Sequence, residues 1–222
     1  MIIDCISDLH GFYPELEGGD LLIVAGDLTA NDSPEQLWRF SQWMIDLDYK
    51  LKVVVPGNHD NVFYEKYYKE HKSPFVPMIY LCDSGVEFEG LKIWGSPWTK
   101  TFEGMNEDCK AFTCDTEEEL AEKWCHIPHD IDILITHSPP RGIGDLVKDQ
   151  SDDEERHCGS EYLAAFFKYA IRPKLHIFGH IHEGYGKYEV YSGYNDTMVQ
   201  SVNASHVNER YQPVNKPIRI IL

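Results

Sequence analysis

One uninterrupted apolar run, from Leu21 to Val24, constrains the fold of this chain more than any other stretch. A run without a polar break is typical of a strand buried on both faces, because a half-exposed strand alternates apolar and polar residues. Ala25 and Gly26 follow the run, and Asp27 stands just beyond the strand end. Ligands collect at this edge of open α/β sheets, and a carboxylate buried there needs a cation or hydrogen-bond donors. Asp27 therefore caps a turn or a helix, or it binds a cation.

Length and composition predict a single globular domain over residues 1–222. A chain of 222 residues with 42% hydrophobic content can bury a full core. It contains no apolar run of about 18 residues, so we expect no membrane span and no membrane partner. Its first residues lack the basic segment of a signal peptide, and its six cysteines form no C-x-x-C pair. We therefore expect a cytoplasmic protein with reduced thiols.

The formal net charge of −17 restricts the classes of partner. Such a field repels polyanions, so we expect no long nucleic acid as a partner. The same field attracts divalent cations. Most of the excess charge is predicted to be solvated surface, in runs such as residues 152–155 and 117–119.

Strands and helices are predicted to alternate along the chain. Strands are expected over residues 2–6, 21–24, 52–55, 78–81, 85–88, 91–94, 131–135, 175–178, 188–191, 197–202 and 218–222. A helix should begin after Ser33, which has the position of an N-cap before a proline. Its expected apolar face consists of Leu37, Phe40, Met44 and Ile45. Further helices are expected over 61–73, after Thr116, and from Ser160 to the break at Arg172-Pro173.

Four other predicted strands also end in polar clusters. Asp8 and His10 follow the first strand, and their spacing of two points both side chains the same way on extended backbone. The pentapeptide Pro56-Gly57-Asn58-His59-Asp60 follows the third strand, His137 follows residues 131–135, and His180 and His182 follow residues 175–178. Taken singly, each cluster also suits a surface turn or a packed polar residue.

Taken together, these clusters favour a metal site. Random polar residues would not fall only at strand ends. Carboxylate, amide and imidazole ligands mixed in this way suit two adjacent divalent ions that share one carboxylate. Two ions at a separation of roughly 3.5–4 Å can hold both the attacking and the leaving oxygen in phosphoryl transfer.

Two further features bear on the substrate. Arg141 follows His137 in a Pro/Gly-rich loop and either holds a phosphate oxygen or is a plain surface arginine. Residues 99–115 carry few helix or strand signals and form either a wall of the substrate site or a mobile surface loop. Arg141 and Asn58 are the candidate substrate-binding residues.

The order D-x-H, G-D, G-N-H-D, T-H and G-H-x-H, over residues 8 to 182, resembles the calcineurin-like metallophosphoesterase superfamily. The motifs of residues 95–98, 136–142 and 178–186 are similar to its metallophosphoesterase-domain-containing (MPPED) branch, which includes cyclic-nucleotide and other phosphodiesterases. Residues 203–205 and 211–215 fit that branch too.

This resemblance implies a fold, a set of ligands and a mechanism. The implied fold is of the α/β (α+β) class, a four-layer sandwich of two mixed sheets flanked by helices. A hydroxide between the metals would be the nucleophile, His59 would protonate the leaving oxygen, and Asp60 would orient His59. One metal would bind Asp8, His10, Asp27 and His182, and the second would bind Asp27, Asn58, His137 and His180.

Differences from other members of the superfamily make two of its functions less expected for this chain, those of the protein Ser/Thr phosphatases and of the DNA-repair nucleases. Asp27 is not followed by the Asp-Arg-Gly of protein Ser/Thr phosphatases, and an acidic chain of 222 residues has no room for the DNA-capping domain of the repair nucleases. Some members of the closest branch lose a histidine of the G-H-x-H motif and with it their activity. This chain keeps His180 and His182, so we expect an active enzyme.

Three functions remain open at this point. The first is hydrolysis of phosphodiesters in small substrates, with cyclic nucleotides among the candidates. The second is a phosphomonoesterase acting on nucleotides or small phosphorylated molecules. The third is a metal-stabilised scaffold that binds partners without turnover. Two divalent ions are the expected cofactors, with Mn first and with Fe, Zn or Ni also compatible with the ligands.

Overall fold

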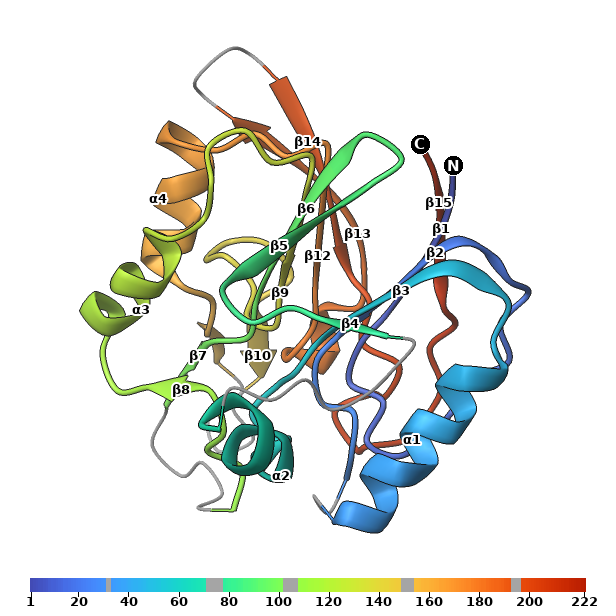
Figure 1. Cartoon of the computed structure of the whole chain (residues 1–222). Coiled ribbons are helices and arrows are strands. Elements are labelled where there is room, and N and C mark those ends of the chain that lie inside the picture. Colours follow the sequence, from blue (N-terminus) through green and yellow to red (C-terminus); the bar gives the residue numbers. More distant parts are fainter. Residues whose placement is uncertain (31–32, 71–77, 102–107, 149–153, 193–196) are drawn as a thin grey trace.

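The computed structural model of the chain describes residues 1–30, 33–70, 78–101, 108–148, 154–192 and 197–222. Two sheets form its centre (Figure 1). The first sheet has the order β15-β1-β2-β3-β4, in which β15 alone is antiparallel to its neighbour. Its strands are β1 (Ile2–Ile6), β2 (Gly19–Ala25), β3 (Tyr49–Val55), β4 (Ile79–Tyr80) and β15 (Ile218–Ile221).

The second sheet has the order β13-β14-β12-β9-β6-β5. Its four inner strands are parallel, and the two edge strands are antiparallel to their neighbours. Its strands are β5 (Ser84–Phe88), β6 (Leu91–Ser96), β9 (Ile133–Thr136), β12 (Leu175–Phe178), β13 (Gly186–Ser192) and β14 (Thr197–Asn203). Short ribbons pair β7 (Thr99–Lys100) with β8 (Thr113–Cys114), and β10 (Leu146–Lys148) with β11 (Glu155–His157).

The two sheets pack face to face and share one apolar core. Ile23 and Val53 from the first sheet belong to the same buried cluster as Ile135 and Ile177 from the second. Burial on both faces explains why these strands are continuous apolar runs in the sequence. Figure 1 shows α1 (Pro34–Asp46) outside the first sheet, and α3 (Glu117–Trp124) and α4 (Glu161–Tyr169) outside the second. The predicted four-layer sandwich of two mixed sheets is therefore confirmed.

The predicted caps of these helices are present. The Ser33 side chain accepts a hydrogen bond from the backbone of Gln36, and Thr116 accepts one from Glu119. The apolar face predicted for α1 is wrong at one position, because Ile45 is 46% exposed. Ser41 takes the inward place instead, at the 3.6-residue spacing from Leu37, and it donates a hydrogen bond to the Leu37 carbonyl.

The stretch 61–73 also differs from the expected element. In place of a helix over 61–73, the structure has one α-turn, α2 (Asn61–Phe63), followed by a π-turn over Tyr64–Tyr68. Residues 71–73 lie outside the described residues, as do 102–107 of the stretch 99–115. Within the described chain, no helix is long and apolar enough to cross a membrane.

Candidate metal centre

The predicted ligands come from five strand ends that meet at one edge of the two sheets. Asp8 and His10 follow β1, Asp27 follows β2, and Asn58 follows β3, all in the first sheet. His137 follows β9 and the pair at 180 and 182 follows β12, both in the second sheet. A cleft of about 290 Å³ opens over this edge. Its lining includes Asp27, Asn58, His59, His180 and His182.

Asp8 and Asp27 each stand in a group of donor atoms close enough to hold a metal ion. Asp8 Oδ1 lies 3.3 Å from His182 Nε2, which lies 3.4 Å from His10 Nε2. Asp27 presents one oxygen to each side. Its Oδ2 lies 3.7 Å from His10 Nε2, and its Oδ1 lies 3.4 Å from His137 Nε2. Asp27 therefore has the position expected of a carboxylate shared by two ions.

The tautomers of two histidines suit metal binding. His137 Nδ1 lies 2.9 Å from the Ala25 carbonyl, and His182 Nδ1 lies 3.1 Å from the Asn208 carbonyl. A carbonyl only accepts, so each Nδ1 carries a hydrogen, and Nε2 is the nitrogen that faces the carboxylates and would bind a metal after losing its proton. This donor set of imidazole nitrogens and carboxylate oxygens fits divalent transition metals.

Asn58 and His180 complete the predicted second group. Asn58 Oδ1 lies 3.1 Å from His137 Nε2, while its Nδ2 donates to the Cys109 carbonyl and so fixes the amide with oxygen inward. His180 lies beside His137, with ring centroids 5.0 Å apart. Its Nε2 contacts the Thr99 hydroxyl at 3.0 Å, which leaves Nδ1 as its ligand atom. Among the described residues His180 belongs to none of the tight three-ligand groups, so its role as a ligand stays a prediction.

The backbone at these strand ends is strained. Four predicted ligands have positive φ angles, namely Asp8 (50°), His10 (43°), Asp27 (52°) and His180 (68°). Non-glycine residues rarely adopt this region, and such strain clusters at functional sites. The neighbouring glycines leave no room for a side chain. A Cβ on Gly57 would lie 2.2 Å from Asp27 Oδ1, and one on Gly179 would lie 2.1 Å from Asp8 Oδ2.

The carboxylates and imidazoles at the centre shift the pKa values of one another. Burial opposes ionisation of Asp8 and Asp27, but the nearby histidines outweigh it and hold the pKa of both carboxyls below their usual values. Burial also opposes the charged form of His137, and Asp27 reverses this and raises its pKa to about 9. Burial dominates at His10 and lowers its pKa to about 4. Two anionic carboxylates beside protonated imidazole form a site in which a metal ion would replace protons.

His59 and Asp60 lie next to this centre. His59 Nε2 is 3.9 Å from Asp27 Oδ2 and its ring contacts the His10 ring, while its Nδ1 lies 3.3 Å from the thiol of Cys109. Asp60 accepts hydrogen bonds from the backbone of Leu28 and of Gly57, so its carboxylate ties two of the ligand loops together. The catalytic roles predicted for His59 and Asp60 are not tested by this geometry.

Arg141 lines a neighbouring cavity of about 500 Å³, together with His180 and Ile181. Its Nη1 lies 3.3 Å from Glu161 Oε1.

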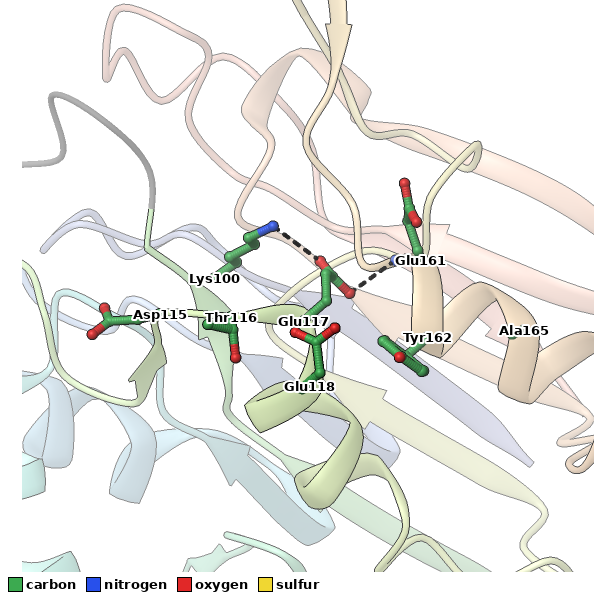
Figure 2. Close-up of a pocket in the computed structure, with 8 residues that line it drawn as sticks. All are labelled: Lys100, Asp115, Thr116, Glu117, Glu118, Glu161, Tyr162 and Ala165. Atoms are coloured by element: carbon green, nitrogen blue, oxygen red, sulfur yellow. Dashed lines mark hydrogen bonds and ion pairs between the residues drawn. The ribbon is translucent and has the colours of Figure 1, made fainter.

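A larger pocket of about 610 Å³ adjoins that cavity between β7 and the beginnings of α3 and α4 (Figure 2). None of the predicted ligands lines it. Glu117 spans it, between Lys100 Nζ at 3.8 Å and the backbone nitrogen of Glu161 at 3.2 Å. The cleft over the strand ends is therefore the smallest of these three hollows, and it is distinguished by the predicted ligands that line it.

Residue-by-residue reasoning from the sequence missed several partners of the centre. Ser205 donates to Asp8 Oδ2 at 2.8 Å, and the rings of Tyr211 and His10 are 4.8 Å apart. Cys109, Asn208 and Tyr211 lie outside the strand-end loops, so the strand-end pattern could not find them. The likeness of residues 203–205 and 211–215 to a known branch was the one available signal for two of these contacts.

The fold and the candidate ligands indicate the class of protein: a two-sheet metallophosphoesterase whose predicted metal ligands lie at the strand ends. The calcineurin-like phosphoesterase profile (Metallophos) matches residues 1–184, and the chain belongs to this family. The family binds divalent metals and hydrolyses phosphoesters.

Named relatives support the same assignment. The chain is 35% identical to Metallophosphoesterase domain-containing protein 1 of Homo sapiens, over 98% of this chain and 70% of that protein. It is 31% identical to a UPF0046 protein of Caenorhabditis elegans, over 95% of this chain and 78% of that protein. A solved crystal structure with 18% identity has a TM-score of 0.62 over 91% of this chain and 89% of that chain, a likeness that shows the fold alone.

Proposed function

We propose that this protein hydrolyses phosphodiester bonds in small substrates, with two divalent ions held by the predicted ligands. The position of Asp27 carries the proposal, since its two carboxylate oxygens face different groups of histidines. When bound, the ions would polarise the phosphoryl group and acidify water. Manganese is our first choice of metal.

The residues of the chain supply positioning and a proton. Asp8, Asp27 and the histidines that follow β9 and β12 would hold the ions, because they stand on rigid strand ends. His59 directs Nε2 toward the same centre, at 3.9 Å from Asp27 Oδ2, and gives its proton to the leaving oxygen. Asn58 turns its amide oxygen inward and so contacts either the metal or the phosphoryl group.

Preference for diesters over monoesters is supported by the rim of the cleft. The exposed residues Glu183 and Glu209 line it, in a chain of net charge −17. A monoester carries up to two negative charges near neutral pH, and a diester carries one. The rim therefore repels the monoester more strongly. A small diester, with cyclic nucleotides among the candidates, fits a cleft of about 290 Å³, whereas long nucleic acid does not suit this charge.

The test compares bis-p-nitrophenyl phosphate with p-nitrophenyl phosphate on metal-stripped protein to which Mn²⁺ is restored. We expect faster turnover of the diester. His59→Ala should keep its metals and lose roughly 10²–10⁴-fold in kcat, the usual contribution of a general acid. His126→Ala, which changes an exposed histidine, is the matched control. Faster turnover of the monoester would favour a phosphomonoesterase instead, and metal binding without hydrolysis of either substrate would favour a scaffold.

A further inference from the structure

Tyr211 stands over the predicted metal centre, although in the sequence it lies well beyond the last predicted ligand, His182. Its ring centroid is 4.8 Å from that of His10, 5.2 Å from that of His182 and 6.3 Å from that of His59. The first two contacts are edge-to-face. Tyr211 also lines the cleft, and half of its surface is exposed. Its ring is therefore fixed against the ligands on one side and open on the other.

A strained turn holds this ring in place. Tyr211 has a φ of +56°, which is unfavourable for an aromatic residue. Asn208 builds the turn: its side-chain oxygen accepts hydrogen bonds from the backbone of Arg210 and of Gln212, and its carbonyl accepts one from the backbone of Tyr211. Strain of this kind persists only where the surrounding structure over-determines it, and it clusters at functional sites.

The same turn is tied to the metal centre. The Asn208 carbonyl that accepts from Tyr211 is also the acceptor for His182 Nδ1, at 3.1 Å. One carbonyl thus sets the orientation of a predicted ligand and the position of an aromatic ring. A substrate whose phosphoryl group lies at the ligands can place its organic part in the cleft beside this ring.

We propose that Tyr211 determines substrate specificity by stacking on an aromatic organic group, aryl or nucleobase, attached to the phosphoryl group. The inference rests on the proposed function for the place of the phosphoryl group. The apolar residues Val147 and Ile181 line the same cleft, so the organic group also meets apolar surface there. Stacking on an aromatic side chain tolerates any flat ring, so the inference names a class of substrate and not one compound.

The test is a binding experiment that needs no turnover. Phenylphosphonate and methylphosphonate carry the same charged group and cannot be hydrolysed as esters. We expect the Mn²⁺-loaded protein to bind phenylphosphonate roughly tenfold more tightly by calorimetry, within the usual range for stacking. Tyr211→Leu should remove this preference and leave the affinity for methylphosphonate unchanged, and Tyr211→Phe should keep it. Tyr169→Leu, at an exposed tyrosine of α4, is the matched control.

Three results would overturn the inference. The first is equal affinity of the wild-type protein for both phosphonates. The second is a preference that survives in Tyr211→Leu. The third is an equal loss of affinity for both phosphonates in Tyr211→Phe, which would assign the role to the hydroxyl group. Metal content is measured in each variant, so loss of the centre is recognised separately. The proposed function is tested separately: it is rejected if bis-p-nitrophenyl phosphate is not hydrolysed, even where the preference for phenylphosphonate is observed.

Discussion

The contact between Cys109 and His59 gives a buried thiol a part in the chemistry of the centre. Cys109 is 7% exposed, and its Sγ lies 3.3 Å from His59 Nδ1. A general acid needs a hydrogen on Nε2, the atom that faces Asp27, and the sulfur beside Nδ1 can accept the second hydrogen of the imidazolium. The Asp60 carboxylate, for which the family resemblance implies this orienting role, accepts hydrogen bonds from the backbone of Leu28 and of Gly57.

We therefore expect Cys109→Ala to lower kcat by roughly tenfold, less than the roughly 10²–10⁴-fold expected for loss of the general acid itself, with little change in KM. Cys109→Ser keeps an acceptor for the Nδ1 hydrogen and should restore most of the rate. Steady-state kinetics on the diester substrate provide the measurement, with Cys125→Ser at an exposed thiol as the control. A rate for Cys109→Ala equal to that of the control would remove this role.

At the scale of elements, the caps of α3 and α4 join two helices over one face of the second sheet. Thr116 makes a single capping bond, to the backbone of Glu119. The Ser160 hydroxyl accepts from the backbone of Leu163 and from Trp124 Nε1, and it donates to Glu117 Oε2. The second cap therefore connects both helices.

Thr116→Ala should cost about 1 kcal/mol of unfolding free energy, as is usual for an N-cap. Ser160→Ala should cost more, because it also leaves the buried Trp124 nitrogen without its partner. Urea denaturation of both variants measures the difference. Metal content should be unchanged in both, and equal destabilisation of the two variants would show that the bonds between the helices contribute little.

The inner strands of the two sheets were predictable because burial on both faces produces continuous apolar runs. The short strands β7, β8, β10 and β11 were not predicted, because two or three residues carry no periodic pattern. The ligands were predictable because they follow those runs directly. The π-turn over Tyr64–Tyr68 was not predictable, because local periodicity cannot separate an α-turn from a π-turn. This π-turn packs aromatic rings on Phe112. Asn208 was also out of reach, and only the family likeness of residues 211–215 pointed to Tyr211, because both positions depend on a turn formed after the last ligand motif and on contacts with distant residues.

At the scale of the whole molecule, His176 makes stability depend on pH. It is fully buried in β12, and burial lowers its pKa to about 3. The Thr136 hydroxyl donates to the Ser138 carbonyl, so it accepts from His176 Nε2 and the ring stays neutral. Below a pH of about 6.5 the unfolded chain binds a proton that the folded chain does not, so stability falls as the pH drops toward 3.

The expected slope for this one residue is about 1.4 kcal/mol per pH unit over that window. His176→Gln has a similar volume and does not titrate, so its unfolding free energy should depend less on pH between about 6 and about 4, which lies inside that window. Chemical denaturation at several pH values, on metal-loaded protein, measures both slopes. Identical slopes would mean that His176 is protonated in the folded state.

The left-handed backbone at Asp8, His10, Asp27 and His180 has a thermodynamic consequence. Folding must hold these residues in strained conformations and bring two carboxylates together, and an ion that binds the assembled set stabilises only the folded chain. By mass action, an ion at a hundred times its Kd adds about 2.7 kcal/mol. The melting temperature should therefore rise with the concentration of Mn²⁺ and fall on chelation, so that a cell short of the metal would hold less of the folded protein as well as less active protein.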